Sequence, residues 1–165
     1  MVSDPVKTVR PADPFETGIL ARLWYDGWQD AHAAILPAEL ARARTLESFT
    51  ERMAAALAEV RVIGPQGAPL GFAILKGDEL DQFYVASRAR GAGVAAVLMA
   101  DAEARLSARG VETAWLACAI GNARAARFYE KCGWYLARTM VSRLDTADGP
   151  FDLKVWRYEK HLERR

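Results

Sequence analysis

Two glycines separated by one residue and flanked by arginines form the segment of this chain with the clearest chemical potential. The segment Arg88-Ala89-Arg90-Gly91-Ala92-Gly93-Val94 lies between a strand-like run and a helix-like run. Glycines let the backbone curl close to a ligand, and the helix that follows offers unpaired N–H groups and the positive end of its dipole. The backbone around Arg90 to Val94 is therefore predicted to cradle a pyrophosphate group. Arg88 and Arg90 either contact its phosphates or face solvent.

A second segment, from Asn122 to Trp134, carries the signals of a complete short helix. Asn122 is a favourable N-cap, and Gly133 is a favourable residue after the last turn. Residues at helical spacing form one apolar face: Ala125, Phe128 and Cys132. Tyr129 stands beside this face, where its hydroxyl needs a partner if it is buried.

Taken together, Arg88-x-x-Gly91-x-Gly93 and Asn122-x-x-Ala125-x-x-x-Tyr129-x-x-x-Gly133-Trp134 resemble the GNAT superfamily of acyl-CoA N-acyltransferases. The first is similar to the motif that holds the CoA pyrophosphate, written Gln/Arg-x-x-Gly-x-Gly/Ala. The second is similar to the helix that follows it. Trp28 to Pro37 also resembles the first helix and the following Leu-Pro of many members, and the resemblance extends from about Val6 to His161. Ser87 departs from the proline that many members have there.

The resemblance implies an N-acetyltransferase that uses acetyl-CoA as cosubstrate, needs no metal, and acts on a primary amine in a small molecule or a peptide. It implies that the strand before the cradle splays from its neighbour, so that Tyr84 to Ala86 line the gap and offer a backbone donor to an oxyanion. The residues then expected to hold the cosubstrate are Tyr84, Val85, Ala86, Arg88, Arg90, Gly91, Ala92, Gly93, Val94, Asn122, Ala125 and Tyr129. Asn122 either reaches the pantetheine arm or only caps its helix.

Direct acetyl transfer needs an acid for the leaving thiolate and a base for the amine, whose ammonium form has a pKa near ~10.4 in a free lysine. Tyr129 is the candidate acid, because a phenol can donate a proton without being ionised at neutral pH. Glu79 is the candidate base by its alignment with a glutamate that activates the amine through water in some members. Asp81 shares its strand face by the period of two. Glu79, Asp81 and a water all stay open as the base, and the two carboxylates also fit a solvated strand end.

Three aromatic residues of the first predicted helix either wall the acceptor pocket or pack in the core: Trp24, Tyr25 and Trp28. His32, near the end of that helix, either lines the pocket, packs against its neighbours or faces solvent. The two cysteines, Cys118 and Cys132, match no metal-ligand spacing and are expected to be reduced and structural.

Composition limits the other classes of function. The chain has 165 residues, 52% of them hydrophobic, and a formal net charge of +1. We therefore expect one domain over residues 1–165, with no bulk attraction to nucleic acid or membrane. The sequence shows no secretory signal and no membrane span, which favours a cytoplasmic protein. A homodimer is an expectation from the family alone.

Hydrophobic periodicity predicts an α/β fold of the α+β type, with the order β-α-α-β-β-β-α-β-α-β-β. The expected strands are Lys7–Arg10, Val60–Gly64, Leu70–Lys76, Glu79–Ala86, Thr113–Ala119, Trp134–Leu144 and Phe151–Tyr158. The expected helices run from near Asp13 to Pro37, over Thr45–Glu59, over Val94–Ala108, and after Asn122. Only the unit from Glu79 to Ala119 should be parallel. The result is a GNAT-like mixed central sheet of about six to seven strands with helices on both faces.

Two other classes of protein share some of these sequence features. A CoA-binding regulatory or scaffold module without catalysis shares the same fold, and the retained Tyr129 argues against it. A Rossmann-type dinucleotide protein fits poorly, because the cradle follows four expected strands rather than the first, and the third glycine of Gly-x-Gly-x-x-Gly is replaced by Ala96.

Overall fold

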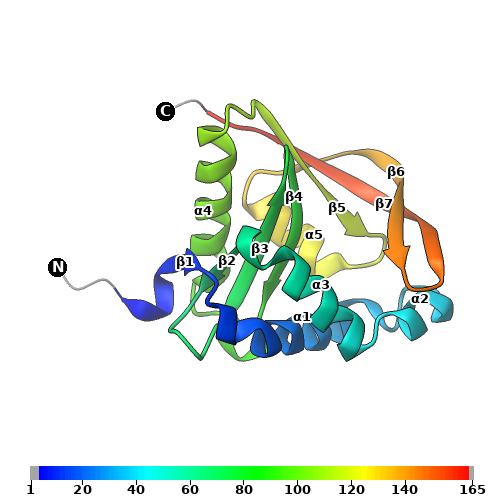
Figure 1. The fold of residues 1–165 in the computed structure, drawn as a ribbon. Helices are drawn as coiled ribbons and strands as arrows, with labels where there is room; N and C mark the ends of the chain where they lie inside the picture. Colours follow the sequence, from blue (N-terminus) through cyan, green and yellow to red (C-terminus); the bar gives the residue numbers. More distant parts are fainter. Residues whose placement is uncertain (1–3, 164–165) are drawn as a thin grey trace.

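A seven-stranded mixed sheet, covered by helices on both faces, organises the computed structural model, which describes residues 4–163 (Figure 1). The helices are α1 Thr17–His32, α2 Ala38–Ala43, α3 Leu46–Ala56, α4 Val94–Ala108 and α5 Ala123–Lys131. The strands are β1 Val9–Pro11, β2 Val60–Ile63, β3 Gly71–Lys76, β4 Glu79–Val85, β5 Thr113–Ala119, β6 Tyr135–Thr146 and β7 Gly149–His161. The predicted fold class is confirmed.

The strands lie in the order β1-β2-β3-β4-β5-β7-β6. Among the described residues, β4 and β5 form the one parallel pair, and every other neighbouring pair is antiparallel. The parallel pair is the one joined by α4, as a strand–helix–strand unit requires. The sequence placed this unit correctly because its helix is long and β5 is apolar.

Two hydrophobic cores lie on opposite faces of the sheet. Leu98, Met99 and Leu106 of α4 pack with Leu116 of β5 on one face. On the other face, Trp24 and Trp28 of α1 pack with Phe49 of α3 and Phe72 of β3. Trp24 and Trp28 are thus core residues, and Tyr25 packs at the edge of the same core.

Several elements differ from those predicted: α1 ends at His32 rather than Pro37, α3 at Ala56 rather than Glu59, and β7 continues to His161. A third helix, α2, follows Pro37, where two helices before the second strand were expected, because Pro37 ends one segment and Leu40 buries the next against the core. The first strand begins at Val9, since Lys7 belongs to a short 3-10 turn. The last hairpin closes over Ala147 and Asp148 alone, because β6 and β7 pair out to Thr146 and Gly149.

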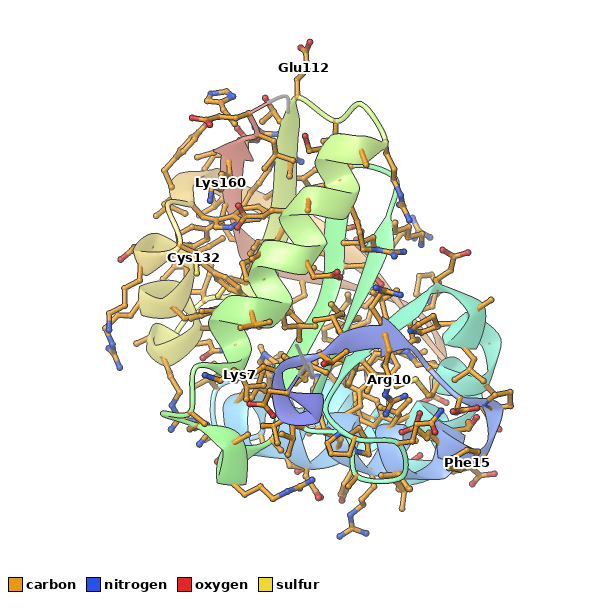
Figure 2. The ribbon with its side chains drawn as sticks, turned by 90° about the vertical axis from the view of Figure 1, so that its left-hand side faces the viewer. Lys7, Arg10, Phe15, Glu112, Cys132 and Lys160 are labelled. Atoms are coloured by element: carbon orange, nitrogen blue, oxygen red, sulfur yellow. The ribbon has the colours of Figure 1, made fainter. Side chains whose placement is uncertain are left out.

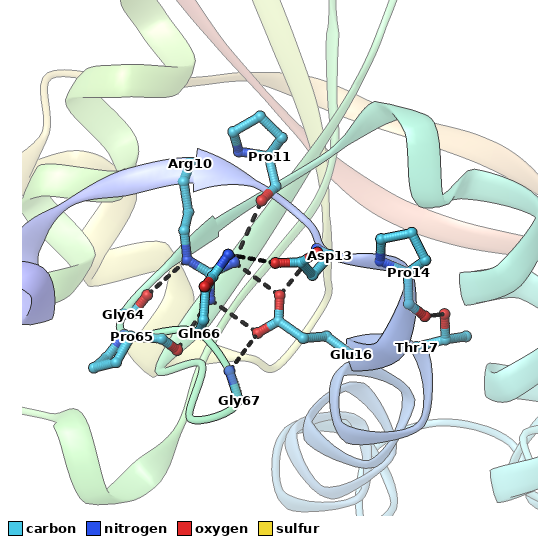
Figure 3. Close-up of polar contacts among 10 residues, drawn as sticks. All are labelled: Arg10, Pro11, Asp13, Pro14, Glu16, Thr17, Gly64, Pro65, Gln66 and Gly67. Atoms are coloured by element: carbon cyan, nitrogen blue, oxygen red, sulfur yellow. Dashed lines mark hydrogen bonds and ion pairs between the residues drawn. The ribbon is translucent and has the colours of Figure 1, made fainter.

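A buried ion pair fixes the entry to α1 (Figure 3). The Glu16 side chain is fully buried and accepts two hydrogen bonds from Arg10, at 2.7 and 2.9 Å. It also accepts from the backbone N–H groups of Asp13 and Gly67, at 3.0 and 3.2 Å. Arg10 in turn donates to the Gly64 carbonyl at 3.0 Å. One carboxylate therefore joins β1, the start of α1 and the β2–β3 loop, and every oxygen lone pair it brings into the interior has a donor.

We expect the Glu16→Gln variant to lose about 3 kcal/mol of unfolding free energy at neutral pH, since it removes the charge opposite the partly buried Arg10 guanidinium. The hydrogen bond from Arg10 holds the pKa of Glu16 below its ordinary value of 4.5. A lowered folded-state pKa stabilises the protein above the unfolded pKa, and that contribution is lost as the pH falls below it. Urea unfolding at pH 7 and at pH 3.5 checks this. A gap between wild type and variant that stays equal at both pH values would contradict it.

Candidate active site

A cavity of about 760 Å³ runs across the sheet between β4 and β5. Its walls come from the end of α1, the loop before α4, the first turn of α4, and α5. A space of this size suits a small-molecule ligand. The glycine-rich loop, the helix after Asn122 and the strand that carries Asp81 thus all contribute to one cavity.

The hollow exists because β4 and β5 diverge. Their only registered pair is Glu79 with Trp115, at the start of β4. Just after it, the β3 register passes from Leu75 opposite Leu80 to Ile74 opposite Gln82, so Asp81 is an extra, unpaired residue. Such a bulge bends its strand and increases the local twist. The splay expected from the resemblance is therefore present, and its cause is a bulge that the sequence pattern did not reveal.

Alternation along β4 decides which backbone groups face the gap. The Ala86 N–H donates to the Leu70 carbonyl at 2.7 Å, on the β3 side. In an antiparallel pair, the backbone N–H and C=O groups of every second residue point to the partner strand. Those of Tyr84 therefore point to β3, as those of Ala86 do, while Phe83 and Val85 direct their N–H groups toward the gap. Of the three residues expected to line it, Tyr84 and Val85 do so and Ala86 does not. Val85 offers the backbone donor.

The loop before α4 has the backbone shape expected of an anion cradle. Gly91 and Gly93 have φ values of 82° and 78°, a region that favours glycine. Both line the cavity, together with Val94. Val94 begins α4, and the first N–H groups of a helix have no partner within it. A pyrophosphate fits this arrangement.

The two arginines of the motif occupy different positions. Arg90 lines the cavity, whereas Arg88 lies outside it and donates to the Pro69 carbonyl at 2.9 Å. Ala92 is also absent from the lining, and its N–H bonds to the Ala89 carbonyl. The pattern Gln/Arg-x-x-Gly-x-Gly/Ala is met a second time, two residues later, by Arg90-x-x-Gly93-x-Ala95. The cavity lining favours this second register, because it contains all three of its defining residues.

Charges from distant parts of the chain gather at the cradle. Asp30, near the end of α1, accepts from Arg90 at 2.8 Å and from Arg124 of α5 at 3.2 Å. Lys7 lies beside the N-terminal end of α4 (Figure 2), with its Nζ 3.6 Å from where a Cβ on Gly93 would stand. Sequence reasoning missed Asp30, Arg124 and Lys7 as a group, because only the fold brings them together.

Tyr129 lies in the cavity wall beside β5. Burial raises the pKa of its hydroxyl, so the phenol stays protonated at neutral pH. No described residue forms a hydrogen bond with this hydroxyl, which leaves it free for a ligand. Asn122 accepts from the Ala125 N–H at 3.3 Å, so it caps α5 while also lining the cavity with Ala125. Burial raises the pKa of Cys118 to about 12, which makes it a poor nucleophile.

The two candidate bases occupy different places. Asp81, the bulged residue, lines the cavity, and Glu79 does not. Burial, followed by the charge of Asp81, raises the pKa of Glu79 to about 7. Burial also raises the pKa of Asp81, against the opposing charges of Lys76 and Arg52. Both carboxyls are thus better bases than exposed ones, but only Asp81 faces the hollow.

The end of α1 forms another wall of the cavity. His32 lines it and packs on Trp28, with ring centroids 5.4 Å apart. Burial lowers the pKa of His32 to about 4, so the ring is neutral. Gly27 lets Tyr84 pass against the helix, since a Cβ there would stand 2.7 Å from the tyrosine ring. His32 is therefore both a packed residue and part of the wall, which joins two of the alternatives that the sequence left open.

Within residues 4–163, no cluster of three or more histidine, cysteine or acidic side chains is arranged to hold a metal ion. The same residues contain no helix with the length and apolarity of a membrane span.

Comparison with known proteins identifies the family that has this fold. Residues 19–134 match the model of the acetyltransferase (GNAT) family. No curated protein sequence matches the chain. A GCN5-related N-acetyltransferase of Rhodopseudomonas palustris is similar in structure, with a TM-score of 0.73, 24% identity, and coverage of 98% of this chain and 99% of that chain.

Two further similar structures contain a ligand. The PaiA N-acetyltransferase of Thermoplasma acidophilum, in complex with coenzyme A, has a TM-score of 0.71 and 16% identity, covering 93% of this chain and 98% of that one. YncA of Salmonella typhimurium, with its cofactor acetyl-CoA, has a TM-score of 0.62 and 16% identity, covering 96% and 95%. At such low sequence identities, these structures share only their fold with this chain. The family match covers most of the chain, and the chain belongs to the GNAT acetyltransferase family.

Proposed function

We propose that this chain is an N-acetyltransferase that transfers the acetyl group of acetyl-CoA to a primary amine by direct attack in a ternary complex, within one domain over residues 1–165. The observation that carries the proposal is the continuity of one cavity from the cradle at Gly93, past Tyr129, to Asp81. PaiA and YncA, which share the fold, hold coenzyme A and acetyl-CoA. The two ends of the cavity suit the two substrates of such a reaction.

The residues fit the cosubstrate in two ways. The left-handed glycines and the N-terminal turn of α4 suit its pyrophosphate. The open edges of β4 and β5 leave backbone groups for its amide-bearing arm. When bound, acetyl-CoA supplies an activated acetyl group as a thioester. The raised pKa values of Cys118 and Cys132 argue against a covalent intermediate on the protein.

Each catalytic task has a residue in place. The Val85 N–H is oriented to stabilise the negative charge that develops on the carbonyl oxygen. Asp81 accepts the proton that the amine loses as its nitrogen bonds to the carbonyl carbon. Tyr129 protonates the sulfur as the carbon–sulfur bond breaks. Glu79 stands second to Asp81 as the base, because it lies outside the cavity wall.

The cradle register is tested by a matched pair of arginine variants. We expect Arg90→Gln to weaken acetyl-CoA binding by about tenfold, since it removes a charge-assisted contact to phosphate. Arg88→Gln should change the Kd by less than about twofold, because Arg88 is engaged with Pro69. Titration calorimetry measures both. A larger loss of affinity in Arg88→Gln than in Arg90→Gln would instead support Arg88-x-x-Gly91-x-Gly93 as the phosphate-binding motif.

For Tyr129→Phe, turnover should fall by about a hundredfold, the usual scale of general acid catalysis. The Kd for acetyl-CoA should change little, because the ring still fills its place. Tyr135→Phe is the control, since Tyr135 is exposed on β6. The assay follows CoA release with a panel of amines. Unchanged turnover would remove Tyr129 from the mechanism, and acetyl-CoA binding without any amine-dependent release would favour a silent CoA-binding module.

The base is identified by the pH dependence of kcat/KM. A base must be deprotonated, so activity falls as the pH drops through its pKa. Asp81 and Glu79 both have raised pKa values, so this acidic limb should lie above the range of ordinary carboxyls. We expect Asp81→Asn to abolish the limb and Glu79→Gln to retain it. The reverse result would assign the base to Glu79.

A further inference from the structure

Two arginines in the cavity wall share one carboxylate oxygen. Arg90 lies in the loop before α4, Arg124 in the first turn of α5, and Asp30 in the last turn of α1. The Oδ2 atom of Asp30 accepts from Arg90 at 2.8 Å and from Arg124 at 3.2 Å. All three residues line the cavity. We call this arrangement the Asp30 bridge.

The Asp30 bridge joins the two sides of the gap at its open end. β4 and β5 have a single registered pair, Glu79 with Trp115, at the start of β4. The loop that carries Arg90 follows the far end of β4, and α5 follows the far end of β5. Gly93 of the cradle borders the same cavity. A ligand that extends from the cradle into the gap therefore meets the bridge.

The bridge uses donors that a phosphate also needs, and it holds them weakly. Among residues 4–163, Asp30 is the one hydrogen-bonding partner of both guanidinium groups. Each arginine gives it a single hydrogen bond rather than a bidentate pair. The side chains of Asp30, Arg90 and Arg124 are 50%, 43% and 62% exposed. Because exposed ion pairs contribute little to stability, the bridge can open at small cost.

Charge favours the exchange of Asp30 for phosphate. A pyrophosphate brings two negatively charged groups to the arginines, whereas Asp30 brings one carboxylate. Asp30 also lies near the C-terminus of α1, where the negative end of the helix dipole disfavours an anion. The arginines offset this effect while they bind Asp30. A phosphate that takes them must therefore replace contacts that already stabilise α1.

We propose that Asp30 is a built-in competitor of the cosubstrate, which gives up Arg90 and Arg124 when the phosphates of acetyl-CoA bind. Asp30 thus lowers the affinity for acetyl-CoA, although it belongs to the wall of the binding cavity. The inference rests on the proposed use of acetyl-CoA and identifies a residue that limits its affinity. It has the opposite sign from a positioning role, in which Asp30 would hold the two guanidinium groups ready for phosphate.

The test is the Kd of acetyl-CoA for Asp30→Asn, measured by titration calorimetry. Asparagine has nearly the shape of aspartate and lacks its charge, so both arginines are released. We expect the Kd to fall by about fivefold, the scale of two exposed ion pairs. An unchanged or raised Kd would overturn the inference.

Asp26→Asn is the matched control, since it changes the net charge by the same amount. Asp26 lies one turn earlier in α1, pairs with Arg22 at 3.1 Å and does not line the cavity. Its replacement should change the Kd by less than about twofold. A gain in Asp26→Asn equal to that in Asp30→Asn would reduce the effect to net charge and overturn the inference.

A second background separates competition from simple repulsion between Asp30 and phosphate. In the Arg90→Gln/Arg124→Gln protein there is no guanidinium for Asp30 to release. Adding Asp30→Asn to this protein should therefore change the Kd by less than about twofold. Equilibrium dialysis measures the weaker binding of this background. A gain as large as that in the parent protein would show repulsion alone and overturn the inference.

These measurements keep the inference apart from the acetyl transfer. Tighter binding in Asp30→Asn without any amine-dependent CoA release leaves the inference standing, and the proposed transfer fails alone. Amine-dependent release by the wild type, combined with weaker acetyl-CoA binding in Asp30→Asn, leaves the transfer standing and makes Asp30 a positioning residue. Absence of acetyl-CoA binding in every protein would overturn both.

Discussion

The divergence of β4 from β5 is the constraint on which the remaining site geometry depends. Backbone N–H and C=O groups in a sheet need partners, so a sheet cannot open at random. Here each diverging strand stays paired along its other edge. β4 is paired with β3 on both sides of the bulge at Asp81, and β5 is paired from Thr113 to Ala119 with β7. The open edges are thus held by rigid neighbours, and their polar groups are presented to whatever occupies the gap.

The elements around this opening serve to place charge at its two ends. α4 brings its positive N-terminus to one end, and the bulge brings Asp81 to the other. α1 closes the side, and its own position depends on Glu16, which binds Arg10, Asp13 and the β2–β3 loop (Figure 3). A polar cluster at the start of α1 therefore helps to fix the helix whose last turn carries His32 and Asp30. The two hydrophobic cores hold the layers, while buried ion pairs and caps set the angles at which elements enter them.

The sequence predicted the parts of this arrangement that depend on local signals. Local residue types are enough to show these parts: Gly91, Gly93 and Gly133 adopt positive φ, and the Asn122 side chain caps its own helix. The apolar periods of α1, α4 and β5 are long, so their existence and order were secure. α2 was missed because six residues after a proline are too few to show a period.

What the sequence did not predict depends on register and on long-range contact. A bulge shifts one strand by one residue against its neighbour, and the residue types of Leu80-Asp81-Gln82 give no signal that predicts a bulge. The choice between Arg88 and Arg90 as the cradle arginine depends on which way a loop turns, since both positions satisfy the same written pattern. Arg44 looks like an ordinary surface residue in the sequence, and only the fold buries it, with its guanidinium bonded to the Asp145 carbonyl of β6.

The near-neutral net charge of the chain conceals a strong separation of charge within the cavity. Arg90, Arg124 and Lys7 surround the cradle, and Asp30 partly neutralises the first two through bonds of 2.8 and 3.2 Å. An anionic ligand at the cradle must compete with Asp30, whose pKa is lowered chiefly by its hydrogen bond from Arg90. Once phosphate takes over the arginines, the Asp30 carboxylate loses both of its partners at the cradle. Binding of the cosubstrate is therefore an exchange of one anion for another at these two arginines, so only the difference between the two sets of contacts contributes to affinity.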